Sequence, residues 1–368
     1  MKLIHIADLH LGSKIESKLK RISDSRKALV RESFNRVVDY AKDNNIKIVL
    51  LSGDIFDSNK PLKKDKEFFY SVIRNNKDID FLYLKGNHDT LESYSEDIDN
   101  LKLFSNEWVS YRYDDVVISG IELNESNYKS FYSTLNLNPN NKNIVMLHGS
   151  IGNTIANNTI KLSLLKDKYI NYLALGHIHS FNSSTFDNNS RYAYPGCLVG
   201  RGFDELGPKG FIVYDTDSSN ITFKEIDNIN ILETNIDISE STDLYQALSI
   251  IKNSMPIDKN QIYRVNINGD VSSNLDISTL DVIEALKDYY FIEVKFNINY
   301  KINIDDYKND VSLKGEAIRL IEAMDDVDNI TKEKLINIIL KSLLGKENII
   351  WNWLNVILMD LVKLKTNI

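Results

Sequence analysis

Cysteine is almost absent from this chain, which has only Cys197 in 368 residues. A single cysteine excludes an intramolecular disulfide framework and a cysteine-rich zinc site, and it suits a reducing cytosol. No uncharged apolar run is long enough to cross a bilayer, and the amino-terminal stretch MKLIHIADLH reaches an aspartate too early for a signal peptide. These absences predict a cytoplasmic protein that does not enter a membrane.

Positive charge is also in deficit, since the net charge is −8. This balance argues against a uniformly basic nucleic-acid binder, although the distribution of charge matters more than its sum. Two basic clusters are present: one between Lys14 and Arg36, with eight cations against three anions, and one formed by Lys60, Lys63, Lys64 and Lys66. Each cluster is either a solvated helix face or a phosphate-binding surface, and its position relative to the reactive residues decides between the two.

The apolar runs are short, and five of them are followed directly by polar residues. Each resembles a buried strand and ends at polar residues: LIHIA before Asp8 and His10, IVLLSG before Asp54, FLYLKG before Asn87 and His88, NIVML before His148, and YLALG before His177 and His179. Segments with helical spacing, 23–44 and 66–75, separate the first three runs, so the predicted fold class is α/β with helices outside a sheet. Functional residues in such sheets collect at the carboxyl ends of the strands.

The patterns divide the chain into three regions. Further strand-like runs extend the first region to about residue 230, which gives a domain over 1–230. Strands and two helices, one with a capping-box pattern at Ser278 and Asp281, predict a small α/β domain over 231–305. Residues 306–368 are predicted to be helical, and their last segment, IIWNWLNVILMDLVKL, is apolar almost all round. Such a helix is buried either in its own protein or against a partner, and both alternatives stay open.

Histidine is rare as well, yet five of the six histidines lie at the strand ends named above. The exception, His5, lies inside the first strand and is expected to be a packed structural residue. Taken singly, each polar residue can cap a helix or satisfy a turn, but their shared edge indicates one site. Carboxylates, an amide and neutral imidazoles suit divalent metals, and there are too many ligands for one tetrahedral ion. We therefore predict two ions about 3.5–4 Å apart, with Asp54 as the bridging ligand.

The ordered motifs D-x-H, G-D-x-x-D, G-N-H-D, H-G and G-H-x-H resemble those of the calcineurin-like metallophosphoesterase family, over about residues 1–230. The resemblance implies a four-layer αββα sandwich that holds two divalent metal ions, with manganese favoured. It implies two ligand sets, which are Asp8, His10, Asp54 and His179 for one metal, and Asp54, Asn87, His148 and His177 for the other. His88 resembles the family histidine that contacts the scissile phosphate and assists the leaving oxygen, so it is expected to be catalytic.

The implied mechanism is in-line attack on the phosphodiester by a water that the two metals activate. No side-chain nucleophile is needed, so Cys197 is expected to be structural. Asp89 is expected either to orient the ring of His88 or to cap a helix. Asp57 has the same two alternatives, since it either supports a ligand from behind or caps a helix.

Within the family, the stretches HIADLHLGS, GDIFDSNKPL and YPGCLVGRGFDELGPKGFIVYD resemble the DNA-repair exonuclease branch of SbcD and YhaO-type proteins. This resemblance implies a DNA exonuclease or endonuclease in DNA repair, with a cap domain at 231–305. It also implies that the carboxyl-terminal helices dock onto an SMC-like coiled-coil ATPase of the SbcC or YhaN type. A second copy of the chain, as a homodimer, is a further candidate partner.

The two basic clusters begin shortly after His10 and Asp54, so we expect them beside the metals, where they can bind DNA phosphates. Two other functions stay open. The first is a small-molecule phosphodiesterase or nucleotidase that uses the same metals. The second is a mainly structural subunit that binds the ATPase.

Overall fold

The computed structural model describes residues 1–89, 98–188, 190–226, 229–272, 275–301 and 310–343. The chain divides into two compact units, Met1–Leu232 and Glu233–Ile368. All of the side chains predicted to form the site belong to the first unit.

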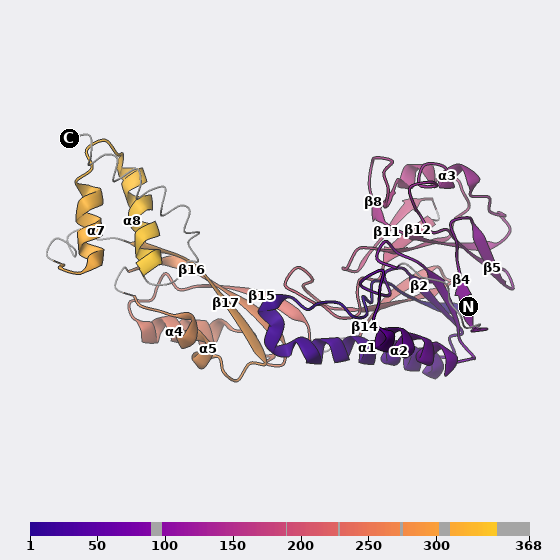
Figure 1. Cartoon of the computed structure of the whole chain (residues 1–368), viewed down its shortest axis with the longest axis horizontal. Coiled ribbons are helices and arrows are strands. Elements are labelled where there is room, and N and C mark those ends of the chain that lie inside the picture. Colours follow the sequence, from indigo (N-terminus) through magenta and orange to yellow (C-terminus); the bar gives the residue numbers. More distant parts are fainter. Residues whose placement is uncertain (90–97, 189, 227–228, 273–274, 302–309, 344–368) are drawn as a thin grey trace. The chain divides into compact units, whose positions relative to one another are not determined.

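The first unit contains two six-stranded sheets (Figure 1). The first sheet has the order β14 (Asn220–Glu225), β13 (Gly210–Asp215), β1 (Lys2–Ile6), β2 (Ile48–Ser52), β3 (Asp80–Leu84) and β4 (Leu101–Leu103). The second has the order β11 (Asn182–Asp187), β12 (Ser190–Tyr194), β10 (Tyr172–Gly176), β7 (Lys142–His148), β6 (Val116–Gly120) and β5 (Val109–Tyr113). A separate two-stranded pair consists of β8 (Ser150–Ile151) and β9 (Thr159–Ile160).

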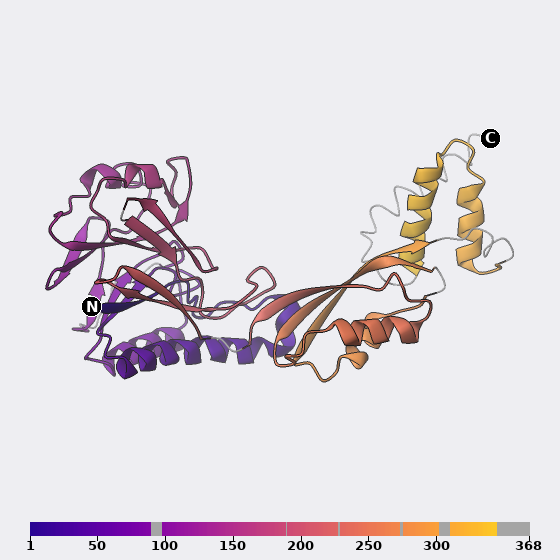
Figure 2. The same ribbon diagram turned by 180° about the vertical axis from the view of Figure 1, so that it is seen from behind.

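Helices α1 (Ser23–Asp43) and α2 (Lys63–Arg74) cover the outer face of the first sheet, and a 3-10 helix, η1 (Ser17–Ile22), precedes α1 (Figure 2). The strands of this sheet are buried on both faces. In β2, Val49 and Leu51 pack with α1 and α2, whereas Leu50 packs against the second sheet. Strands buried on both faces have no polar alternation, which is why they appear in the sequence as continuous apolar runs.

The outer face of the second sheet has a thinner cover. A one-turn helix, α3 (Phe131–Thr134), a 3-10 helix, η2 (Leu162–Leu164), and loops pack against it, with Phe131 among the buried residues. The predicted α/β sandwich is confirmed, but its fourth layer is mostly loop because the chain between β6 and β10 forms no long helix.

The strands that carry the predicted site residues all end at the same edge. β1, β2 and β3 pair in parallel in the first sheet, and β7 and β10 pair in parallel in the second. Parallel strands bring their carboxyl ends, and the loops that follow them, to one side. The carboxyl ends of these five strands, each followed by predicted site residues, therefore lie in a common region.

The second unit has a sheet of β15 (Ile231–Asp237), β16 (Ile262–Ser272) and β17 (Phe291–Lys301), with β16 and β17 parallel. Its described residues form the helices α4 (Leu244–Ser254), α5 (Thr279–Ala285), α7 (Leu313–Glu322) and α8 (Asn329–Leu343). The capping box at the start of α5 is present, with Ser278 and Asp281 bonding to each other's backbone N–H. The apolar segment predicted as a helix at 349–364 lies outside the described residues. In the described ranges, no helix combines the length and apolar content needed to cross a bilayer.

Candidate metal centre

Side chains that could hold a metal ion meet in three overlapping clusters at the shared strand edge, and two of these clusters contain only residues predicted as ligands. Within each group the ligand atoms lie within 4.8 Å of one another. Group A consists of Asp8, His10 and His179, and group B consists of Asp54, His148 and His177. Asn87 adjoins group B, because its Oδ1 lies 3.1 Å from His148 Nε2 and 3.1 Å from His177 Nδ1. The structure thus brings together all of the side chains that the sequence predicted as ligands.

Asp54 lies between the two groups. Its Oδ2 is 3.3 Å from His148 Nε2 in group B and 3.9 Å from His10 Nε2 in group A. Its Oδ1 accepts a hydrogen bond of 2.9 Å from the backbone N–H of His88, which fixes the orientation of the carboxylate. One oxygen within reach of both groups is the geometry that a bridging ligand requires.

Hydrogen bonds behind the imidazoles direct their other nitrogens into the site. His148 Nδ1 lies 2.9 Å from the carbonyl oxygen of Ser52, so this nitrogen carries the proton and Nε2 presents a lone pair. His179 Nδ1 lies 2.7 Å from Glu205 Oε1. The guanidinium of Arg201 is 3.1 Å from the same nitrogen, but the shorter contact to a carboxylate assigns the proton to Nδ1. Metal-ligating histidines are usually held in this way.

Glu205 and Arg201 were missed by the sequence analysis. Arg201 donates to Glu205, and its Nη1 lies 3.3 Å from Asp57 Oδ1. Asp57 Oδ1 in turn lies 3.3 Å from His10 Nδ1, so one guanidinium connects the carboxylates behind both histidines of group A. Burial alone would raise the pKa of Glu205, but hydrogen bonds from His179 and Arg201 hold it well below its usual value. The only signal in the sequence is a charged pair spaced i, i+4 in the glycine-rich run 200–210.

The backbone is strained at several predicted ligands. Asp8, His10, Asp54 and His177 have φ values of 53°, 47°, 53° and 102°. Left-handed backbone at a residue other than glycine costs about 1–3 kcal/mol and persists only where the surroundings enforce it. Hydrogen bonds of 2.9 Å from Asp8 N to Gly53 O and from His10 N to Asp54 O join the first two loops. Strain concentrated at these positions indicates a functional reason for the residues that occupy them.

Two glycines of the motifs are required by close approach. A Cβ on Gly53 would lie 2.2 Å from His148 Nδ1, and a Cβ on Gly86 would lie 2.2 Å from Asp54 Oδ1. A side chain at either position would push a predicted ligand out of place. The glycines therefore belong to the site as much as the ligands do.

His88 lies outside groups A and B, but it forms the third cluster with His10 and Asp57, in which the ligand atoms also lie within 4.8 Å of one another. It is exposed, its Nδ1 lies 3.1 Å from the carbonyl oxygen of Asp57, and its ring contacts His10 edge-on with centroids 5.2 Å apart. Of the two alternatives for Asp57, the structure favours support from behind, through His10 Nδ1 and through the carbonyl that holds His88.

The expectation that Asp89 orients His88 is wrong. The buried carboxylate of Asp89 accepts hydrogen bonds from the backbone N–H groups of Ile55 (3.1 Å), Phe56 (2.8 Å) and Gly86 (3.1 Å). It holds the loop after β2 against the loop after β3, because its oxygens must find donors inside the protein. The helix-capping alternative concerns residues 90–97, which lie outside the described ranges.

The electrostatics of the site favour a bound positive charge. Burial raises the pKa of Asp8 to about 6. Burial disfavours the imidazolium of His148, but the hydrogen bond and charge of Asp54 outweigh this effect and raise its pKa to about 9. A proton on His148 thus partly offsets two buried carboxylates. A divalent cation can take the place of that proton, and the oxygen and imidazole donors present are suitable ligands.

Cys197 and His5, which were expected to be structural residues, are both buried. Cys197 is buried, and burial raises the pKa of its thiol to about 12, which makes it a poor nucleophile. His5 lies between the two sheets with its Nδ1 2.8 Å from the hydroxyl of Tyr172. Neither contributes to groups A or B.

The basic cluster between Lys14 and Arg36 is only partly a surface. Arg26 is 1% exposed and donates to the carbonyl oxygens of Gly200 and Ile229. Arg31 pairs with Asp65, and Arg36 with Glu32. Three of the eight cations counted in this cluster therefore have partners within the protein, and Arg26 is not part of the surface. Lys14, Lys20 and Lys27 remain exposed.

Comparisons with known proteins agree with this geometry. The sequence profile described as calcineurin-like phosphoesterase matches residues 1–181. The chain is 27% identical to the DNA double-strand break repair protein Mre11 of Sulfolobus acidocaldarius, across 87% of this chain and 85% of that protein. It is 26% identical to Mre11 of Sulfurisphaera tokodaii, across 49% of each chain. It is 31% identical to one component of the nuclease SbcCD of Bacillus subtilis, across 26% of this chain and 24% of that protein. The first 181 residues therefore form a calcineurin-like phosphoesterase domain, and this domain contains groups A and B.

Proposed function

We propose that this chain is a metal-dependent DNA nuclease that acts in DNA repair. The observation that carries the proposal is the pair of ligand groups that meet at Asp54. The names of its relatives, a nuclease component and double-strand break repair proteins, support DNA as the substrate. A phosphodiester is therefore the proposed bond that is cleaved.

In this proposal, group A and Asp54 hold one divalent cation, and group B with Asn87 holds the second. We propose manganese as the native metal, because these mixed oxygen and nitrogen donors are compatible with it. Divalent cations held there supply Lewis acidity to phosphate oxygens and to an attacking water.

The chain's own residues then have separate tasks. Ser52 and Glu205 keep the protons of His148 and His179 on Nδ1, so that each Nε2 stays a ligand. The carbonyl of Asp57 holds His88 at Nδ1, which leaves Nε2 to contact the phosphate or to protonate the leaving oxygen. His88 is the proposed catalytic residue because its ring adjoins His10 of group A. It also forms a cluster of possible ligands with His10 and Asp57, so the experiment measures metal content as well as cleavage.

The central experiment is an assay of purified protein on linear duplex DNA with manganese, beside a His88→Ala variant. We expect the variant to retain two bound metal equivalents, measured by elemental analysis, and to lose cleavage. Loss of metal from the variant would make His88 a ligand. A wild-type protein that hydrolyses only nucleotides or a chromogenic diester, and never DNA, would favour the small-molecule alternative.

Exposed lysines near the site support a polyanionic substrate. Lys14 and Lys20 follow group A in the chain, and Lys60 follows Asp54. Replacing all three by glutamine should reduce DNA cleavage relative to hydrolysis of a small diester, and should flatten the dependence of DNA binding on salt. An equal reduction on both substrates would remove this support.

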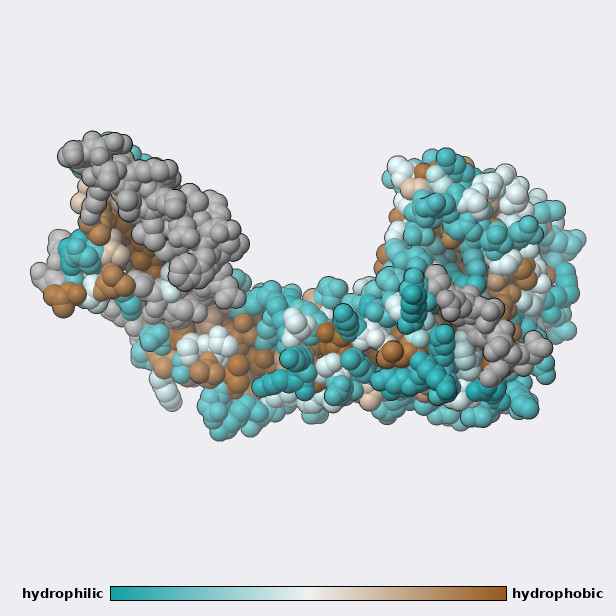
Figure 3. Space-filling view, viewed as in Figure 1, coloured by the Kyte–Doolittle hydropathy of each residue, from teal (hydrophilic) through white to brown (hydrophobic). Residues whose placement is uncertain are grey.

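We also propose that the carboxyl-terminal region binds a coiled-coil ATPase. In the described part of that region, Val311, Leu313 and Ile330 are 98%, 70% and 68% exposed, and apolar residues are visible on this surface in Figure 3. Exposed apolar side chains of this size are typical of interaction sites. Val311→Glu with Leu313→Glu should abolish co-elution with the purified ATPase and leave manganese-dependent cleavage in place. A variant that lost cleavage but kept co-elution would contradict this assignment.

A further inference from the structure

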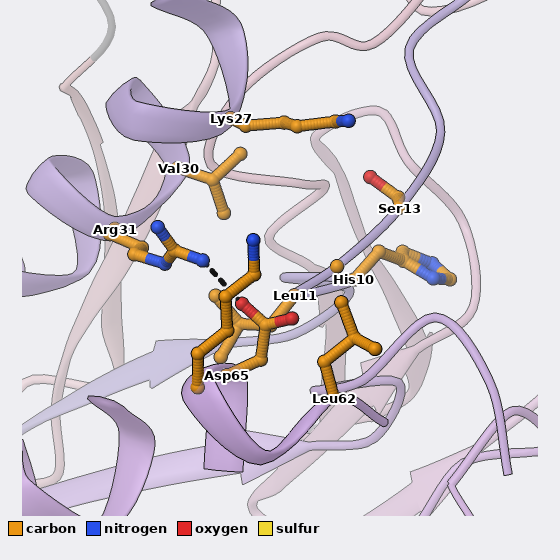
Figure 4. A pocket seen from close by; sticks show the side chains of 10 residues that line it. His10, Leu11, Ser13, Lys27, Val30, Arg31, Leu62 and Asp65 are labelled. Atoms are coloured by element: carbon orange, nitrogen blue, oxygen red, sulfur yellow. Dashed lines mark hydrogen bonds and ion pairs between the residues drawn. The ribbon is translucent and has the colours of Figure 1, made fainter. Parts of the chain in front are cut away.

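A cavity of about 60 Å³ lies beside His10 (Figure 4). Three segments line it: the loop after β1, helix α1 and the start of helix α2. The polar side chains that face it are those of His10, Ser13, Lys27, Arg31, Lys64 and Asp65. The space is larger than a single water needs, so it can accept a small polar group.

The cavity has an excess of positive charge. Arg31 Nη2 lies 2.5 Å from Asp65 Oδ1, and Asp65 is fully buried, so these two charges offset each other. Lys27 lies one turn before Arg31 on α1, and its ammonium extends across the cavity in Figure 4. In the described part of the chain, neither Lys27 nor Lys64 forms an ion pair. Three cations and one carboxylate leave a net charge of two positive units.

The start of α2 adds to this charge. The helix begins at Lys63, and its N-cap, Leu62, offers no side-chain hydrogen bond to the first turn. Leu62 and Lys64 both line the cavity, so the uncapped end of the helix borders it. Backbone N–H groups at a helix start carry partial positive charge and bind anions.

We infer that this cavity binds a second phosphate of the substrate, the one next to the phosphate that is hydrolysed. The inference rests on the proposed function. His10 lines the cavity and also belongs to group A, so a group bound here lies beside the candidate metal centre. Phosphate oxygens would accept hydrogen bonds from Lys27, Lys64 and the hydroxyl of Ser13. A diester with one phosphate leaves the cavity unfilled, whereas a polynucleotide fills it.

The test compares three dinucleotides with manganese: TpT, which has one phosphate, and its 5′-phosphorylated and 3′-phosphorylated forms, which have two. We expect the wild-type protein to show kcat/KM at least about tenfold higher on one of the two phosphorylated forms than on TpT. The phosphorylated dinucleotide with the higher kcat/KM shows whether the cavity binds the phosphate on the 5′ or on the 3′ side of the hydrolysed bond. Lys27→Gln and Lys64→Gln should each remove most of the gain.

Lys63→Gln is the matched control, because Lys63 is adjacent in sequence, lies on the same helix and does not line the cavity. The Lys63→Gln variant should keep the higher kcat/KM on the phosphorylated dinucleotide. Equal gains on both phosphorylated forms, or equal losses in Lys63→Gln and Lys64→Gln, would show non-specific attraction and overturn the inference.

Failure of the wild-type protein to hydrolyse any of the three dinucleotides or DNA would instead contradict the proposed function. In that case calorimetry with the same compounds, with Ca²⁺ in place of manganese, still tests the cavity. Equal affinity of the wild type and of Lys64→Gln for both phosphorylated forms would overturn it.

Discussion

Groups A and B have similar ligands but are held in place by different means. The histidines of group A are supported by charged side chains, since Glu205 contacts His179 and Asp57 contacts His10, with Arg201 joining the two carboxylates. The ring of His148 in group B is supported by a backbone carbonyl, that of Ser52. The support of His10 and His179 can therefore be altered by changing a side chain, whereas the support of His148 Nδ1 can be altered only by disturbing the main chain.

The difference follows from the positions of the groups in the fold. His148 is the last residue of β7, a buried strand, and its Nδ1 lies 2.9 Å from the main-chain carbonyl oxygen of Ser52 at the end of β2. His10 and His179 lie in loops past the strand ends, where the loop after β12 brings in Arg201 and Glu205. Removing side-chain support should thus weaken one metal, and removing the shared ligand should weaken both.

The largest effect is expected from Asp54→Asn, because one oxygen of Asp54 lies near histidine nitrogens of both groups. The amide keeps the shape of the side chain but loses the negative charge that two cations would share. We expect affinity for both metals to fall by more than about 100-fold, with cleavage lost. Elemental analysis of the purified variant is the measurement. Retention of one full metal equivalent would show that Asp54 serves a single ion.

Glu205→Gln should affect group A alone. Supporting carboxylates typically contribute about 10–100-fold in metal affinity, so one of two binding steps in calorimetry should weaken by that factor while the other stays. Asp204→Asn is the matched control, as an exposed carboxylate one residue away. Equal weakening of both steps in Glu205→Gln would contradict separate support of the two groups.

Gly53→Ala should affect group B through the main chain. The added Cβ would lie 2.2 Å from His148 Nδ1, and φ at Gly53 is +94°. Strain and displacement together should lower the free energy of unfolding by about 1–3 kcal/mol and weaken the second metal. Gly207→Ala separates the two causes, because Gly207 has φ of +82° but no atom within 4 Å of its Cβ position. If Gly207→Ala lost metal as strongly as Gly53→Ala, backbone strain and not the contact with His148 would explain the loss.

Much of the fold could be predicted because its signals are local. Buried parallel strands leave apolar runs, and α1 leaves a helical spacing, so the position of the strand ends followed from short stretches of sequence. The convergence of these ends follows from parallel pairing, which is a general property of α/β sheets.

The support behind the ligands could not be predicted, because it depends on contacts between distant segments. Glu205 lies 26 residues after His179, and nothing in the spacing of the two indicates a hydrogen bond. Asp89 adjoins His88 in sequence, yet its carboxylate turns away to bind the backbone of the loop after β2. Arg26 was counted as a surface charge because sequence does not reveal that its guanidinium is buried against two carbonyls. The left-handed φ values of Asp8 and Asp54 could not be predicted either, because only a minority of aspartates adopt this conformation.

The smallest effect concerns His5, a buried histidine whose Nδ1 lies 2.8 Å from the hydroxyl of Tyr172. Burial lowers the pKa of His5 to about 3, whereas in the unfolded chain a histidine titrates near pH 6.5. The unfolded state therefore binds the extra proton as pH falls below about 6.5, so the stability associated with neutral His5 is present above that pH and is lost progressively toward pH 3. Between pH 6.5 and 5.5 this one group should lower the free energy of unfolding by about 1 kcal/mol. Urea unfolding of metal-free wild-type and His5→Gln proteins at the two pH values measures the difference, since the other titrating groups are common to both. Equal pH dependence in the two proteins would show that the pKa of His5 is the same in the folded and unfolded states.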